Sequence, residues 1–116
     1  WAGANNPIWI VRESELIATK GDKQPIARHP NIEPFTTHQI TVESQDCVYL
    51  FTDGYSDQFG GKSNKKFKTA AFKRLFVSVN NMSMHKQALH IDQTFEDWRG
   101  QVEQLDDVCV LGLRIS

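Results

Sequence analysis

The spacing of apolar residues changes once along this chain, near residue 65, and that change limits the folds open to it. Before this point apolar and β-branched residues come in short runs between Gly, Pro, Asn and Asp, which is typical of strands. We predict strands at residues 8–11, 16–19, 39–43 and 47–52. The short spacing of the first two runs predicts a hairpin. The run at 47–52 has no polar alternation, which predicts a central strand covered on both faces.

After residue 65 the apolar residues follow a helical period. Residues 65–79 have apolar side chains at four-residue spacing with a basic opposite face, and a second helix is predicted from the N-cap Ser83 to Gly100. A last strand is predicted at 108–115. Strands, then two helices, then a returning strand favour an α+β domain with a mostly antiparallel sheet. A chain of 116 residues with 40% hydrophobic content suits one core, so we predict a single domain over 1–116.

The net charge and the cysteine content indicate which partners and which cellular compartment to expect. A formal net charge of −1 gives no overall attraction to nucleic acid, and no nucleic-acid partner is expected. Cys47 and Cys109 each lie in an apolar run, which predicts reduced, buried thiols and a cytoplasmic location. No apolar stretch is long enough to cross a bilayer. Because the chain begins at Trp1, we expect it to be a piece of a longer protein.

Two acidic motifs flank the strands with the most apolar character. Asp53-Gly54 follows the run at 47–52, and Asp106-Asp107 precedes the last predicted strand. Antiparallel neighbours would bring these carboxylates together, where oxygen ligands favour Mg²⁺ or Mn²⁺ over zinc. The alternative is that Asp53-Gly54 forms an ordinary turn and that Asp106-Asp107 is a solvent-exposed polar pair that precedes a strand. Both interpretations remain open on spacing alone.

Other sequence features give weaker indications of function. Gly60-Gly61-Lys62-Ser63 resembles the end of a phosphate-binding Walker loop, but Ser56 stands where its first glycine belongs, so a turn is favoured. No His-Glu-x-x-His or Gly-x-Ser-x-Gly motif occurs. A run without acidic residues between Asp57 and Asp92 contains seven basic residues: Lys62, Lys65, Lys66, Lys68, Lys73, Arg74 and Lys86. This run is either a solvated helix face or a docking surface for an anionic partner.

Four segments together resemble the stage II sporulation protein E-like branch of the metal-dependent (PPM, or type 2C-like) serine/threonine phosphatases. They are residues 2–7 (AGANNP), 20–26 (KGDKQPI), 49–61 (YLFTDGYSDQFGG) and 103–110 (EQLDDVCV). The resemblance covers nearly the whole chain. It implies a mostly antiparallel β-sandwich flanked by helices, with a two-metal centre of Mn²⁺ or Mg²⁺ at one edge. This chain would be the C-terminal portion of that domain.

Carried over by position, the resemblance implies that Asp53 and Asp106 are the catalytic ligands. The implied metal site comprises Asp53, Gly54, Asp106 and, less directly, Asp107. A further Asp-Gly pair of such domains would lie before Trp1, so the two-metal centre is expected to be incomplete here and the chain alone nearly inactive. The implied substrate is a phosphorylated protein of the anti-sigma-antagonist type, and the implied input comes from upstream sensor segments that could tether the parent protein to a membrane.

Two further expectations follow. A domain of this kind that has lost catalysis would act as a binding module, with the basic helix at 65–79 as its docking face. Part of a sandwich also leaves sheet edges and apolar faces uncovered, which predicts a homodimer.

Overall fold

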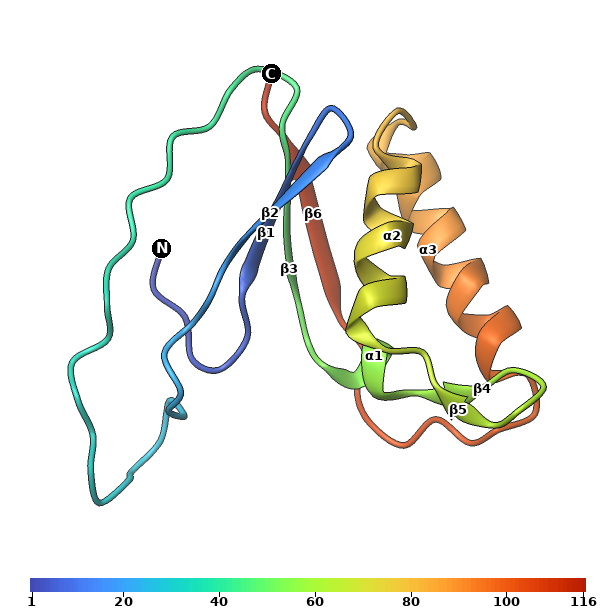
Figure 1. The fold of residues 1–116 in the computed structure, drawn as a ribbon, viewed down its shortest axis with the longest axis horizontal. Coiled ribbons are helices and arrows are strands. Elements are labelled where there is room, and N and C mark those ends of the chain that lie inside the picture. The colour runs from blue at the N-terminus through green and yellow to red at the C-terminus, as the bar shows by residue number, and fades with distance from the viewer.

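The computed structural model describes residues 1–116 as an antiparallel sheet with two long helices on one face (Figure 1). The sheet has the strand order β2-β1-β3-β6. Its strands are β1 (Ile8–Arg12), β2 (Glu15–Thr19), β3 (Cys47–Phe51) and β6 (Val110–Arg114). All three neighbouring pairs run antiparallel. The predicted α+β class with an antiparallel sheet flanked by helices is confirmed.

The remaining elements lie between β3 and β6 in the sequence. They are α1 (Gly54–Asp57), β4 (Phe59–Gly60), β5 (Lys65–Lys66), α2 (Thr69–Val79) and α3 (Met84–Arg99). Strands β4 and β5 form a separate two-stranded sheet at one end of the molecule (Figure 1). No helix has the length and apolar content required to cross a membrane.

The β1–β2 hairpin forms where the spacing predicts it. Its register runs from Ile8 opposite Thr19 to Arg12 opposite Glu15, which leaves a two-residue turn. Glu13 in that turn has a φ of 55°, and positive φ is what tight hairpin turns require. The hairpin places β1 beside β3, where Trp9 lies opposite Tyr49.

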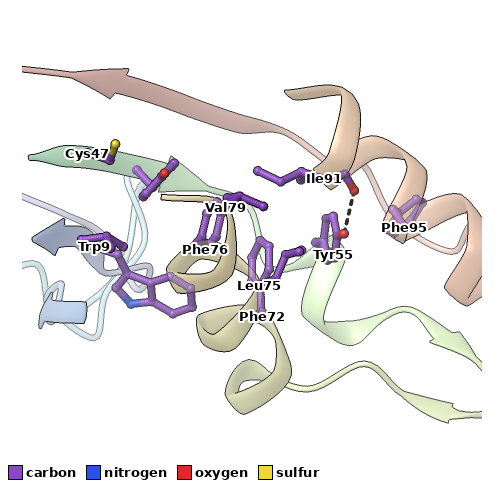
Figure 2. Packing of buried hydrophobic residues seen from close by; sticks show 11 residues of the cluster. Trp9, Cys47, Tyr55, Phe72, Leu75, Phe76, Val79, Ile91 and Phe95 are labelled. Atoms are coloured by element: carbon purple, nitrogen blue, oxygen red, sulfur yellow. Dashed lines mark hydrogen bonds between the residues drawn. The ribbon is translucent and has the colours of Figure 1, made fainter. Parts of the chain in front are cut away.

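The core is an aromatic cluster between β1, β3 and the helices (Figure 2). Trp9 is 1% exposed, and its ring lies 5.5 Å from that of Phe72 and 5.7 Å from that of Phe76. The Phe76 ring is 4.2 Å from the ring of Tyr49. Tilted and edge-on contacts at these distances suit aromatic pairs. The apolar stripe of α2 therefore holds that helix against the sheet.

Both ends of α3 follow their sequence signals. The Ser83 side chain accepts a hydrogen bond from the Lys86 amide at 3.3 Å, as an N-cap does. Gly100 at the C-cap has a φ of 52°, a conformation that favours glycine. The helix at 65–79 instead begins at Thr69, because Lys65–Lys66 pairs with Phe59–Gly60 as a strand.

The helices cover one face of the sheet, and the opposite face is covered at β1, where Ile8 and Ile10 are buried, but left uncovered at β3 and β6. The expectation that β3 is buried on both faces is therefore wrong. Cys47 and Tyr49 point into the core, whereas Leu50 is 38% exposed. Leu50 lies opposite Leu111 in β6, and the uncovered face also exposes other large apolar side chains. Those exposed by at least 38% on β2, β3 and β6 are Ile17, Leu50, Leu111 and Leu113. The chain thus supplies one large sheet of the implied sandwich.

Two local predictions are wrong. Residues 39–43 form no strand, because β1 and β3 already have neighbours on both sides and this segment pairs with neither edge strand. Its alternating pattern is local, whereas pairing depends on distant partners. Cys109 is exposed, because it alternates with the exposed Leu111 and Leu113, while its neighbour Val108 packs against the core. Cys47 is buried as predicted. Both thiols are free.

Candidate functional site

The carboxylate of Asp53 stands where β3 gives way to α1. Its backbone has φ −77° and ψ −9°, and its side chain makes no capping hydrogen bond to the helix. Aspartate at an N-cap usually bonds to the first amides of the helix. Here the exposed carboxylate is left unused by the fold, so it is available to a ligand.

The chain that leads into β6 passes directly beside this point. Thr52 Oγ1 donates a hydrogen bond to the Asp107 carbonyl oxygen at 3.0 Å and accepts one from the Cys109 amide at 3.0 Å. The Thr52 amide also donates to the Cys109 carbonyl oxygen at 3.0 Å. Three hydrogen bonds through one residue therefore fix the end of β3 to the segment that carries the Asp pair.

Gly54 allows the Asp107 backbone to lie directly against the start of α1. A Cβ atom at this position would lie 2.3 Å from the Asp107 carbonyl oxygen, which no side chain tolerates. Glycine is thus required by close backbone contact, and Gly54 itself is buried.

Tyr55 anchors this corner to the helices (Figure 2). Its ring stacks on Phe72 with centroids 4.4 Å apart, and its hydroxyl donates to the Ile91 carbonyl oxygen at 2.7 Å. Burial raises the pKa of the Tyr55 phenol, so the hydroxyl remains a neutral donor. The short helix α1 is therefore a rigid base for Asp53.

Asp106 and Asp107 are both exposed at the same corner. Asp106 Oδ1 accepts a hydrogen bond from the Asp107 amide at 2.7 Å, and the Asp106 carbonyl oxygen accepts one from Gln104 Nε2 at 3.0 Å. These bonds order the loop that precedes β6. The structure thus brings the Asp53-Gly54 segment and the Asp106-Asp107 segment into contact, as their positions at the ends of antiparallel strands predict.

The donor set suits a hard divalent cation. All candidate side chains are carboxylates, the ligand type that Mg²⁺ and Mn²⁺ prefer. Yet no three His, Cys, Asp or Glu side chains lie close enough to enclose an ion. Asp53, Asp106 and Asp107 could therefore hold a cation only together with ligands from elsewhere, such as water or further protein groups.

Sequence reasoning missed two residues that build the site, Thr52 and Tyr55. Thr52 ends an apolar run and Tyr55 follows the Asp-Gly pair, so their partners at Asp107 and Ile91 could not be inferred from local pattern.

Gly60 has a structural explanation: a Cβ atom there would lie 2.0 Å from the Trp98 carbonyl oxygen. This contact packs the β4–β5 hairpin against the end of α3.

Comparisons with known proteins agree with this geometry. The structure matches the SiaA-PP2C domain of Pseudomonas aeruginosa with a TM-score of 0.89 at 23% identity, covering 99% of this chain and 45% of that one. The chain therefore has the fold of part of a PP2C domain and spans less than half of that relative. No curated protein matches it significantly. A sequence model described as Stage II sporulation protein E (SpoIIE) matches residues 1–116, and the chain belongs to that family.

Proposed function

We propose that this chain is part of a metal-dependent phosphoprotein phosphatase that acts on phosphoserine or phosphothreonine. The observation that carries the proposal is the contact between the segments of Asp53 and Asp107, made by Thr52 and Gly54. This contact brings together the two segments that carry the exposed residues Asp53, Asp106 and Asp107, where β3 ends and β6 begins. Membership of the family supports the reaction class.

In this proposal Asp53 and Asp106 hold Mn²⁺ or Mg²⁺, with Asp107 and Gly54 completing this side of the centre. Bound cations would supply the Lewis acidity that hydrolysis of a phosphate ester needs. The other residues act by position. Thr52 keeps the Asp pair beside the end of β3, and Tyr55 keeps α1 on the helices, so the carboxylates are fixed before a substrate arrives.

The test is phosphate release from a phosphoserine peptide with Mn²⁺ present. It should use both the 116-residue chain and the protein with any sequence that its gene encodes upstream. We expect release by the longer form, little by the chain alone, and loss of release in Asp53→Asn and Asp106→Asn. Asp97→Asn is the control, because Asp97 lies on α3 and bonds only to Gln93. Full activity in both site variants would contradict the proposal.

The second candidate is a phosphatase-like binding module without catalysis. The exposed basic residues favour it, because they offer a docking surface for an anionic partner. Calorimetry with Mn²⁺ separates the two functions. A module would bind an anionic peptide but no Mn²⁺, even with its upstream sequence present.

The proposal also includes the substrate of the enzyme, its cellular location and its regulation. The substrate is a phosphorylated regulator of the anti-sigma-antagonist type, in the cytoplasm, and sensor segments of the same protein govern its dephosphorylation. Assays that compare such a phosphorylated antagonist with an unrelated phosphopeptide test this choice. Equal rates on both would contradict it.

The apolar face of the sheet supports a homodimer. Leu111 and Leu113 on the edge strand β6 are 58% and 47% exposed, which is unusual for a monomer's sheet face. Light scattering should show a dimer of the 116-residue chain that Leu111→Lys dissociates. A monomer at high concentration would contradict the dimer.

A further inference from the structure

Three exposed basic residues lie at the same end of the molecule as Asp53. Lys62 lies in the β4–β5 turn, Lys65 in β5, and Lys68 at the N-cap of α2. We call these three residues the basic hairpin. None of them has a carboxylate partner, whereas the neighbouring Lys66 pairs with Asp57 at 3.6 Å. The basic hairpin therefore carries charge that the fold does not neutralise.

The basic hairpin is joined to α1, the helix that begins after Asp53. The Lys68 amide donates to the Ser56 carbonyl oxygen at 2.8 Å, and the Phe67 amide donates to the Gln58 carbonyl oxygen at 2.9 Å. Ser56 is less than one helical turn, about 5 Å, from Asp53 along the axis of α1. Figure 1 shows α1, β4, β5 and the segment between α3 and β6 together at this end.

Phe67 makes this surface rigid. Its half-buried ring lies 5.3 Å from the ring of Tyr55 and 5.4 Å from the ring of Trp98. The aromatic side chain next to the lysines is thus committed to packing. It offers no platform on which a nucleic-acid base could stack.

Lys68 has a backbone conformation that is unfavourable for lysine. Its φ is 76° and its ψ is 153°, a region occupied almost only by glycine. The conformation is held by the hydrogen bond to Ser56 and by one from the Phe72 amide to the Lys68 carbonyl oxygen at 3.1 Å. Glycine would relieve the strain, so a charged side chain is kept here at a cost in stability. Strain of this kind occurs chiefly at functional sites.

We infer that the basic hairpin binds the acidic, phosphorylated segment of the protein substrate beside Asp53, with Lys68 as the principal contact. The inference rests on the proposed function and names its substrate class. A phosphate group carries close to two negative charges, and ammonium groups bind such acceptors with charge-assisted hydrogen bonds. The affinity falls as salt is added, because the surface is exposed.

The test is fluorescence anisotropy with a labelled phosphoserine peptide flanked by Asp and Glu, measured in EDTA. We expect Lys68→Gly to weaken binding about tenfold, which corresponds to about 1.4 kcal/mol. The same variant should unfold at a higher temperature than wild type, because the strain is removed. Lys68→Arg should retain binding. Arg74→Ala is the matched control, since Arg74 is exposed on α2 without an ion pair.

Equal affinity of wild type and Lys68→Gly would overturn the inference, as would stronger binding of a single-stranded oligonucleotide than of the peptide. The double variant Lys62→Ala/Lys65→Ala provides a second test, with a further loss expected. Binding in EDTA does not depend on hydrolysis, so the two proposals can fail separately. If the protein hydrolyses the peptide but Lys68→Gly binds it as tightly as wild type, only the inference about the basic hairpin fails. If Lys68→Gly binds the peptide more weakly but no form of the protein hydrolyses it, only the proposed phosphatase function fails.

Discussion

Strand β3 has an aspartate near each end, and the two aspartates have opposite surroundings. Asp46, just before the strand, is 1% exposed and accepts hydrogen bonds from Arg12 Nε at 2.9 Å and Nη2 at 2.7 Å. It also accepts one from the Glu43 amide at 2.8 Å. Asp53, after the strand, is exposed and has no such bond. The same residue type is satisfied by the fold at one end and left free at the other.

The comparison separates a carboxylate that the fold uses from one that the fold leaves free. A buried carboxylate needs partners, and Asp46 has them. An exposed carboxylate held on a rigid corner needs none and remains available. The following variants probe the two ends of β3, from the largest expected effect to the smallest.

Gly54→Ala should have the largest effect at the Asp53 end. The added Cβ would meet the Asp107 carbonyl oxygen at 2.3 Å, so the backbone must move. We expect a loss of about 1–3 kcal/mol in the free energy of unfolding, as for other overpacked sites. Ser63→Ala is the control, because Ser63 is exposed in the β4–β5 turn. Urea denaturation measures both, and an equal or smaller loss in Gly54→Ala would contradict the close approach.

Thr52→Val should have a smaller effect at the same end. It removes the side-chain hydrogen bonds to the Asp107 carbonyl oxygen and from the Cys109 amide, both at an exposed position. We expect a loss of about 1 kcal/mol. Faster hydrogen exchange of the Cys109 amide would show that the Asp pair is no longer fixed. Unchanged exchange would mean that Thr52 does not make this junction.

Asp46→Asn tests the buried carboxylate at the start of β3 through the pH dependence of the free energy of unfolding. The pKa of Asp46 is lowered, chiefly by its hydrogen bonds from Arg12. Its ionised form therefore stabilises the fold above the unfolded-state pKa of about 3.9, and this contribution is lost as the pH falls through the lower folded-state pKa. Unfolding measured between pH 2 and 7 should show a flatter acid dependence in Asp46→Asn than in wild type. Glu103→Gln, an exposed carboxylate replacement, should keep the wild-type slope, and parallel curves for all three proteins would refute the assignment.

Asp53→Asn should have the smallest effect on stability. We expect a change within about 0.5 kcal/mol without metal, because no hydrogen bond of the fold is lost. A cation that binds the folded state raises its melting temperature. Mn²⁺ should therefore stabilise wild type and not Asp53→Asn, as read by calorimetry with the upstream sequence present. Equal stabilisation of both would place the cation elsewhere.

The sequence predicts the elements whose signals are local. The alternation and turn of the β1–β2 hairpin, the stripe of α2 and the caps at Ser83 and Gly100 all lie within a few residues. The contact between the segment of Asp53-Gly54 and the segment of Asp106-Asp107 was also predictable, because both flank strands that an antiparallel sheet makes neighbours.

What depends on distant partners could not be predicted. The segment 39–43 has a strand pattern but no free neighbour. The ion pair of Arg12 and Asp46 joins residues 34 apart, and neither stands in a recognisable motif. The unusual backbone of Lys68 follows from its hydrogen bonds to Ser56 and Phe72.

The most direct measurement of the central claim is a Mn²⁺ titration of the ¹⁵N-labelled protein followed by nuclear magnetic resonance. Paramagnetic broadening falls off steeply with distance, so it reports which amides surround the ion. If the two acidic segments form one side of a metal centre, the amides of Asp53, Gly54, Asp106 and Asp107 broaden first, and Asp53→Asn abolishes this. Broadening of one segment without the other, or first around Asp46, would contradict the account.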